Sequence, residues 1–196
     1  MFPIAVLISG GGSTLRNILE RCRDGRLQGV EVVGVVASRE CSGLEHARQF
    51  GVPCAVISRG KPFDAADFSR RLTAQLEQWQ PSLLVFGGFL SIYLLPPHYQ
   101  GKAINIHPAL LPRFGGRGMY GDRVHEAVLA SGAATSGCTV HLVDNEYDHG
   151  PIIAQQEVPV QEGDTVETLG ERVRAVECEL YPTVIGSFAE KSIEHA

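Results

Sequence analysis

The stretch that decides the fold is IAVLISGGGST, residues 4–14. Its first five residues are all apolar, which is typical of a parallel strand that is covered on both faces. The glycine-rich turn leads into a segment with apolar residues at helical spacing, at Leu15, Ile18 and Leu19. A strand, a tight turn and a helix in this order predict a βαβ unit, and therefore parallel strands joined by right-handed crossovers.

The same alternation continues down the chain before it changes. Predicted strands cover residues 30–37, 54–57, 82–86 and 102–107, and predicted helices cover residues 43–50, 63–79 and 123–130. Two further strands, 135–143 and 152–160, have no helix between them and should pair antiparallel. A final helix is predicted from Asp164, preferred to Thr165 as the N-cap, to about residue 190. The fold class is therefore α/β: a Rossmann-like, doubly wound, mainly parallel sheet with a C-terminal antiparallel hairpin and a final helix.

Length and composition describe an ordinary globular chain. With 196 residues, 44% of them hydrophobic and 20% charged, it fits one domain of the usual size. No apolar run approaches the roughly 20 residues needed to cross a bilayer, and a net charge of -5 argues against a surface that coats nucleic acid. The amino terminus runs into the first strand without a basic region, so we predict no signal peptide.

The cysteines are odd in number, scattered along the chain, and without a C-x-x-C pair. This pattern predicts reduced thiols in an intracellular, cytoplasmic protein, with neither a disulfide framework nor a zinc site. The five residues are Cys22, Cys41, Cys54, Cys138 and Cys178.

The glycine-rich turn is a candidate anion site. Free backbone N–H groups and the start of the next helix would face an anion there, and the hydroxyl of Ser13 or Thr14 can add a donor. The turn has neither the Lys-Ser/Thr ending of a P-loop nor the G-x-G-x-x-G spacing of a dinucleotide site. Phosphate binding and a merely tight connection between strand and helix are both open at this point.

Residues 104–112, INIHPALLP, place two polar side chains at the end of a strand. Asn105 and His107 share one face because side chains alternate along a strand, and the next residue is a proline that cannot continue the ladder. The pair is either catalytic, or a strand end with a hydrogen-bonded His and a turn-forming Asn. Asp148 lies in an acidic turn, where a solvated Asp is the default, and His141 lies on a strand, where a core His is the default.

Two more segments lie where open α/β sheets bind ligands, beyond the carboxyl ends of strands. Residues 88–93 follow a second glycine turn and can line an apolar pocket or pack as plain core. The loop 113–121 is rich in glycine and arginine, and its length indicates a functional or mobile segment. Trp79 is predicted to pack at the end of its helix, and His125 and His149 to be structural or surface residues.

Together these motifs resemble the phosphoribosylglycinamide formyltransferases, folate-dependent enzymes of purine biosynthesis, over essentially the whole chain. The resemblance rests on ISGGGS at 8–13, GF at 88–89, INIHPALLP at 104–112, GCTVH at 137–141 and DHGP at 148–151. The run N-x-H-P-x-L-L-P is shared with other users of formyl-tetrahydrofolate, such as methionyl-tRNA formyltransferase and formyltetrahydrofolate deformylase. The glycine loop, and the expected lack of a second domain, favour the member that acts on glycinamide ribonucleotide.

The resemblance implies a reaction and its catalytic residues. The amine of glycinamide ribonucleotide attacks the formyl carbon of 10-formyltetrahydrofolate directly, through a tetrahedral oxyanion, without a covalent intermediate or a metal. Asn105 donates its amide N–H to the formyl oxygen, and His107 stabilises the developing charge. Asp148 holds the charge state of His107 and helps to remove the amine proton through water, with His141 in support. A metal site at His107, His141 and Asp148 is conceivable from residue types alone.

The resemblance also assigns binding residues. By this resemblance, the nucleotide phosphate and ribose are bound by Gly12, Ser13, Thr14, Arg174 and Glu177. The last two could equally be a surface ion pair, because they are neighbours on one helix face. The folate is expected to be bound by Leu90, Ser91, Ile92, Tyr93, Asn105, Asp144, Asn145, Glu146, Tyr147 and Asp148. Related enzymes often carry arginines where this chain has Ser91 and Ala65 or Ala66, so the partner of the folate glutamyl carboxylates is open, with Arg117 or Arg123 as candidates.

On this hypothesis residues 1–196 form one formyltransferase domain, with a phosphate-binding half at about 1–100 and a folate and catalytic half at about 101–196. Its partners are the two small-molecule substrates, not nucleic acid or a membrane, and it is a monomer or a homodimer. Two alternatives use the same centre: a 10-formyltetrahydrofolate hydrolase, and a formyltransferase for another amino sugar. A third is a non-catalytic module that binds a phosphate or a nucleotide.

Overall fold

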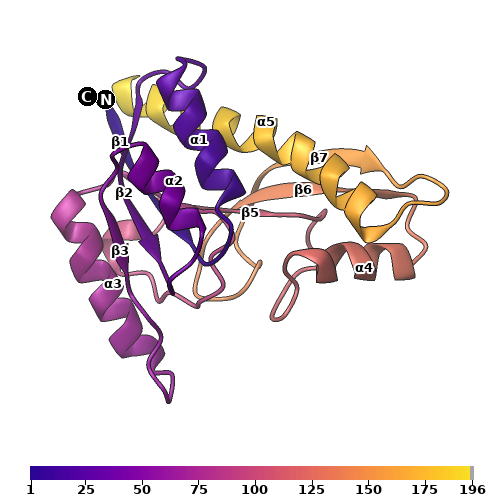
Figure 1. Ribbon diagram of the computed structural model, residues 1–196, viewed down its shortest axis with the longest axis horizontal. Coiled ribbons are helices and arrows are strands. Elements are labelled where there is room, and N and C mark those ends of the chain that lie inside the picture. The colour runs from indigo at the N-terminus through magenta and orange to yellow at the C-terminus, as the bar shows by residue number, and fades with distance from the viewer. Residues whose placement is uncertain (195–196) are drawn as a thin grey trace.

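The computed structural model describes residues 1–194, within which seven strands form one mixed sheet (Figure 1). The strand order is β3-β2-β1-β4-β5-β6-β7; the first five strands along the chain run parallel, and the last two are antiparallel to their neighbours. The predicted sheet and its antiparallel hairpin are therefore confirmed. The strands are β1 (Phe2–Ile8), β2 (Val30–Ala37), β3 (Cys54–Val56), β4 (Leu83–Phe86), β5 (Ala103–His107), β6 (Thr135–Leu142) and β7 (Ile152–Pro159).

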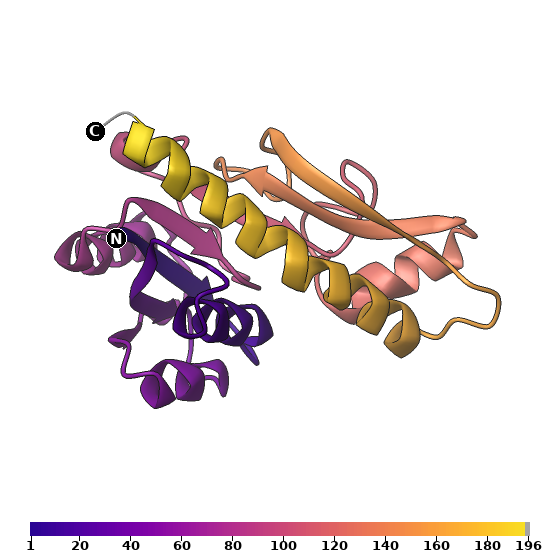
Figure 2. The ribbon, with the colours of Figure 1, turned by 90° about the horizontal axis from the view of Figure 1, so that it is seen from above.

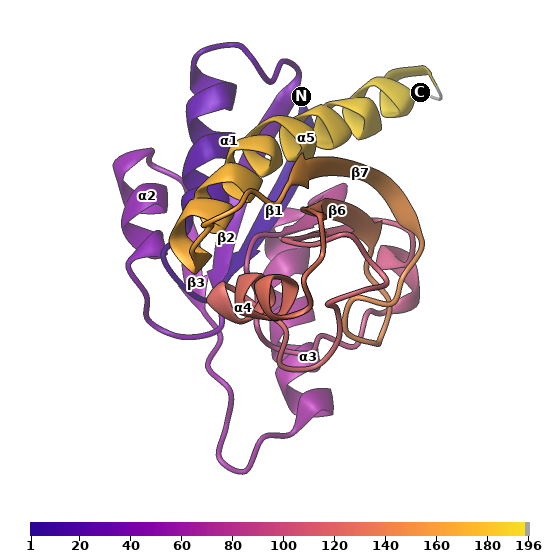
Figure 3. The same cartoon turned by 90° about the vertical axis from the view of Figure 1, so that its right-hand side faces the viewer.

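Helices cover both faces of the sheet, as a doubly wound fold requires (Figure 3). On β1, Ile4, Val6 and Ile8 pack toward α1, α2 and α5, whereas Ala5 and Leu7 pack toward α3. Burial on both faces explains why the strand is apolar throughout. The helices are α1 (Ser13–Arg23), α2 (Gly43–Gln49), α3 (Ala65–Trp79), α4 (Asp122–Ala130) and α5 (Val166–Glu194), with a short 3-10 helix at Pro97–Tyr99.

The long helix α5 links the two ends of the molecule. It runs past α1 and reaches α4 (Figure 2). Its buried Tyr181 places a hydroxyl 3.0 Å from the Phe86 carbonyl oxygen and 2.9 Å from that of Ile104. The helix is therefore fixed to the last residue of β4 and to the second residue of β5. Among the described residues, no helix is long and apolar enough to span a membrane.

The start of α5 differs from the prediction. The helix begins at Val166, so Thr165 is the N-cap and the prediction of Asp164 was wrong. Thr165 N donates to Thr168 Oγ1 at 3.0 Å, and Thr168 N donates to Thr165 Oγ1 at 3.3 Å. This is a reciprocal capping box in which a threonine does what a Glu or Gln usually does. Asp164 instead binds both terminal nitrogens of Arg172, at 2.6 and 2.8 Å.

Trp79 packs on the sheet, as predicted for the end of its helix. A Cβ added at Gly34 of β2 would lie 2.1 Å from the Trp79 ring, so the indole occupies the space that a side chain would fill. The strand can therefore carry only glycine at this position while the tryptophan remains.

We expect Gly34→Ala to lower the free energy of unfolding by about 1–3 kcal/mol, because the added methyl overpacks the indole. Urea unfolding followed by circular dichroism measures the loss. The double variant Gly34→Ala with Trp79→Leu should regain part of it, because the shorter side chain leaves room. An unchanged midpoint for Gly34→Ala would contradict this packing.

Candidate active site

The end of β5 opens into a cavity of about 780 Å³, a usual size for a small-molecule site. Asn105 and His107 both line it, which fits the predicted shared strand face. β5 is the last parallel strand, and β6 passes it in the opposite direction with Asn105 opposite His141 and His107 opposite Thr139. Side chains from two neighbouring strands of opposite direction, β5 and β6, therefore meet at one point of the sheet.

His107 is held between a backbone carbonyl and a carboxylate. Its side chain is 3% exposed, its Nε2 donates to the Phe114 carbonyl oxygen at 2.8 Å, and its Nδ1 lies 3.5 Å from Asp148 Oδ2. Burial lowers the pKa of His107, although Asp148 and the Phe114 carbonyl act in the other direction. The ring is therefore neutral at pH 7 with its proton on Nε2, and Nδ1 can accept a proton.

Asp148 is the charged partner of His107. Its Oδ2 accepts a hydrogen bond from Gly116 N at 2.9 Å. Burial raises the pKa of Asp148, but the nearby imidazoles of His141 and His107 and the Gly116 N–H together lower it below the usual value. The carboxylate is therefore ionised at neutral pH. Its φ of 53° lies in the left-handed region, which Asp and Asn tolerate better than most residues.

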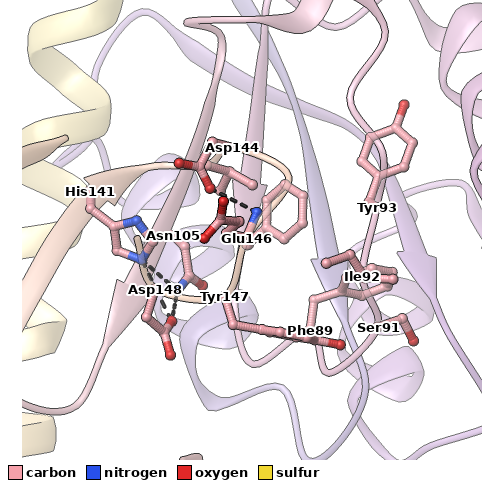
Figure 4. A pocket seen from close by; sticks show the side chains of 12 residues that line it. Phe89, Ser91, Ile92, Tyr93, Asn105, His141, Asp144, Glu146, Tyr147 and Asp148 are labelled. Carbon is pink, nitrogen blue, oxygen red and sulfur yellow. Dashed lines mark hydrogen bonds and ion pairs between the residues drawn. The ribbon is translucent and has the colours of Figure 1, made fainter. Parts of the chain in front are cut away.

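Asn105 and His141 complete the group (Figure 4). His141 Nδ1 donates to the Leu142 carbonyl oxygen at 2.8 Å, which leaves Nε2 to accept from Asn105 Nδ2 at 3.1 Å. The same Asn105 nitrogen lies 3.5 Å from Asp148 Oδ1. His141 thus aims the amide of Asn105, and the long bond to Asp148 is the one that a ligand oxygen can replace.

Another end of the cavity is suited to an anion. Ser13 and Thr14 begin α1, and Arg174 and Glu177 project from α5 into the same cavity. Gly12 does not line the cavity; its φ is 71°, and an added Cβ would lie 2.7 Å from Gly43 Cα. The glycine is thus required for the close approach of α1 and α2. Arg174 and Glu177 line the cavity and form no ion pair within the described chain.

The pKa of Glu177 is shifted because its carboxyl group lies in the cavity wall. Burial raises its pKa to about 7, and Arg174 opposes this rise. Because the folded pKa exceeds the ordinary value of 4.5, ionisation of Glu177 destabilises the free protein as pH rises from about 4.5 to 7. A carboxylate near its midpoint can hydrogen-bond hydroxyl groups in either protonation state.

We therefore expect Glu177→Gln to change how stability depends on pH. Between pH 5 and 8 the free energy of unfolding of the unmodified protein should fall by about 2 kcal/mol relative to the variant. Urea titrations at several pH values measure this difference. Parallel curves for the two proteins would show that Glu177 ionises normally.

A smaller cavity of about 60 Å³ adjoins the large one, and the two share Phe89, Ile92, Asn105, Tyr147 and Asp148. Of the residues predicted to bind folate, it is lined by Ser91, Ile92, Tyr93, Asn105, Asp144, Glu146, Tyr147 and Asp148, whereas Leu90 lines the large cavity. Asn145 lines neither, because its Oδ1 accepts from Leu95 N at 3.0 Å. The Tyr93 hydroxyl pairs with Thr73 at 2.8 Å, so only the ring is available to the cavity.

Three comparisons place the chain among known proteins. The family model for formyl transferase matches residues 3–185. The chain belongs to this formyl transferase family. It is similar to the chloroplastic phosphoribosylglycinamide formyltransferase of Arabidopsis thaliana, with 42% identity over 97% of this chain and 66% of that protein. The match to the Escherichia coli phosphoribosylglycinamide formyltransferase is 36% identity, over 95% of this chain and 87% of that protein.

A solved structure has the same fold. Glycinamide ribonucleotide transformylase 1 from Symbiobacterium toebii superimposes with a TM-score of 0.87 at 37% identity, covering 97% of this chain and 89% of that one. The chain spans slightly less than two thirds of the length of the plant relatives. Its formyl transferase fold is thus shared along nearly the whole described chain.

The formyl transferase site contains a residue whose position was not predicted. His125 of α4 is 6% exposed, lines the large cavity, and has an Nδ1 without a hydrogen-bond partner. Burial lowers its pKa, so it is a neutral ring that lines the same cavity as Arg174 and Glu177. Nothing in the sequence around it marks a ligand site. Within residues 1–194, no group of three or more His, Cys, Asp or Glu side chains has the arrangement of a metal site.

Proposed function

We propose that this protein transfers the formyl group of 10-formyltetrahydrofolate to the amine of glycinamide ribonucleotide, giving formylglycinamide ribonucleotide and tetrahydrofolate. The observation that carries the proposal is that one cavity joins an anion-suited end to the group formed by Asn105, His107 and Asp148. The names of the plant and bacterial relatives support the same reaction.

The two substrates enter from different faces of the sheet. The nucleotide phosphate meets the start of α1, where Ser13 and Thr14 offer donors, and Arg174 neutralises its charge. Glu177 hydrogen-bonds the ribose hydroxyls. The pterin ring of the folate occupies the small cavity between Phe86, Phe89 and Val143, with polar edges toward the turn at 144–148. The amine and the formyl group thus meet at the end of β5.

The chemistry follows from the charge states of the free site. As the amine attacks, the formyl oxygen takes the place of Asp148 at the Asn105 amide and becomes the oxyanion. His107 Nδ1 accepts the proton released by the amine, directly or through water, and Asp148 stabilises the imidazolium that forms. The same proton passes to N10 of the folate as its bond to the formyl carbon breaks. No covalent enzyme intermediate and no metal is needed, because proton and charge are both carried by these residues.

Residues 1–196 act as one domain on this proposal, with the nucleotide phosphate bound mainly by the amino-terminal half and the catalytic residues contributed by the other. A monomer or a homodimer in the cytoplasm would suffice, because every residue in the proposed roles comes from one chain. The alternatives differ in the acceptor: water for a hydrolase, another amino sugar for a related transferase, and none for a binding module.

Purified protein with 10-formyltetrahydrofolate, with and without glycinamide ribonucleotide, tests the proposal. We expect formyl loss, followed by absorbance, that depends on the amine and yields one formylated product per folate consumed. Equal rates without the amine would favour the hydrolase. Turnover with a different amino sugar alone would favour the related transferase, and binding without turnover would favour the module.

A further inference from the structure

Tyr181 of α5 connects the two strands that carry the walls of the small cavity. Its side chain is fully buried, and its one hydroxyl proton is shared between the carbonyl oxygens of Phe86 on β4, at 3.0 Å, and Ile104 on β5, at 2.9 Å. Burial raises the pKa of Tyr181 well above its ordinary value, so the hydroxyl keeps its proton at neutral pH. The group takes no part in the chemistry proposed for the site.

Beyond this hydroxyl, β4 and β5 have separate partners. Phe86 and Asn105 form the last pair of the ladder between the two strands. The chain that leaves β4 is bound to β1, since Gly87 N donates to the Leu7 carbonyl oxygen at 2.9 Å, whereas β5 continues alongside β6. Without the hydroxyl, two carbonyl oxygens would lie unpaired in the core. The least costly relief is for the ends of the two strands to move apart.

The junction of β4 and β5 sets the width of the small cavity. Residues 86–93 supply one wall, and Asn105 with β6 and the turn at 144–148 supplies the other (Figure 4). The carbonyl of Ile104 belongs to the peptide group that leads into Asn105, and that of Phe86 belongs to the peptide group that leads into the glycine turn. The hydroxyl therefore fixes both walls at their bases.

The position of α5 around Tyr181 is fixed by a second helix. Pro182 lies inside α5 and has no N–H, so the Cys178 carbonyl oxygen, four residues earlier, lacks its helical donor. Asn17 of α1 supplies the missing donor, with its Nδ2 at 2.9 Å from that oxygen. The phenol is thus held against the sheet by a helix that is itself hydrogen-bonded to α1.

We propose that Tyr181 is a positioning residue, which holds Asn105 at a fixed distance from residues 86–93 so that one folate touches both walls. The inference rests on the proposed function, in which the folate ring lies against Phe86 and Phe89 while the formyl oxygen reaches the Asn105 amide. Ring and formyl group belong to one molecule, so the two walls must match the distance between them. A wider junction keeps the ring bound but moves the amide away from the oxyanion, which slows the transfer.

Two folates that differ only in the formyl group test this without the transfer reaction. Tetrahydrofolate and 10-formyltetrahydrofolate are titrated by fluorescence in the absence of the nucleotide. The unmodified protein should bind the formylated folate roughly fivefold more tightly. Tyr181→Phe keeps the ring and its packing, so it should bind tetrahydrofolate as before and lose most of this preference. Gly34→Ala is the matched control, because it also disturbs a buried contact but lies outside both cavities, and it should keep the preference.

In the transferase assay, Tyr181→Phe should lower kcat about tenfold, with both KM values nearly unchanged. In an Asn105→Ala background the same substitution should lower kcat by less than about twofold, because it acts through the missing amide. Equal losses in the two backgrounds, an unchanged kcat, or the same loss in Gly34→Ala overturn the inference.

Absence of any preference for the formylated folate in the unmodified protein also overturns the inference. If the preference is present and depends on Tyr181, but the protein transfers no formyl group, the positioning role stands and the proposed reaction falls.

Discussion

Replacement of His107 should lower kcat by about 10²–10³-fold, with the KM values of both substrates nearly unchanged. The reason is that Nδ1 can accept a proton beside the reacting atoms, while Nε2 is committed to the Phe114 carbonyl oxygen. The side chain touches the substrates only where the bond changes occur. Transition-state stabilisation is lost, and ground-state binding is kept.

Two substitutions at this position separate chemistry from packing. His107→Ala leaves a buried space and an unpaired Phe114 carbonyl, so it should lose stability as well as rate. His107→Gln can still donate to that carbonyl but cannot take up a proton, so it should regain stability and remain slow. His98→Ala is the control, since His98 is exposed and pairs weakly with Glu77 at 3.8 Å. A His107→Gln enzyme with normal kcat would remove the imidazole from the proposed mechanism.

Asp148→Asn should also reduce kcat, by about 10²–10³-fold, because the imidazolium formed during the reaction loses its counter-charge. Asparagine tolerates the backbone φ of 53° and still offers an oxygen to Gly116 N. The substitution therefore removes charge with little change of shape. Asp24→Asn provides a control, because Asp24 is exposed and pairs only with its neighbour Arg26.

The pH dependence of kcat/KM is a second measurement on the Asp148→Asn variant. Asp148 raises the pKa of His107 against the effect of burial, so its neutralisation should lower that pKa further. The acid limb of the kcat/KM profile should then move to lower pH, since the neutral imidazole persists there. In the folded protein the pKa of Asp148 is itself below its ordinary value, so its ionisation stabilises the fold above about pH 4. The variant should lack this part of acid unfolding, and an unmoved acid limb would contradict the pairing.

The sequence predicted the sheet and the shared strand face of Asn105 and His107 because both follow from simple periods. A five-residue apolar run followed by a glycine turn is typical of a strand buried on both sides, and the two-residue alternation of a strand puts Asn105 and His107 on one face. The N-cap of α5 was missed because a Thr–Thr capping box carries no acidic signature. That Arg59 lines the large cavity could not be predicted, because a loop of eight residues gives no period from which to place a side chain.

The partners of the proposed catalytic residues could not be predicted from the sequence for a different reason. His141 faces Asn105 only because β6 pairs with β5 in one register of several that its apolar pattern permits. Phe114 and Gly116 contribute backbone atoms to His107 and Asp148, and backbone atoms are the same in every residue type. His125 reaches the cavity through the orientation of α4, a tertiary property.

The span of α5 has a consequence for biosynthesis of the chain. Ser13 and Glu177 line the same cavity, but Ser13 leaves the ribosome well before Glu177, because 163 residues lie between them. Asn105, His141 and Asp148 are closer in sequence and can associate earlier, whereas the anion-suited end of the cavity waits for a helix that also covers the core. Closing the hydrophobic core and completing the substrate site are therefore one event. The large cavity is therefore incomplete in a nascent chain until α5 has packed, so ligand binding in this cavity reports on molecules in which α5 is in place.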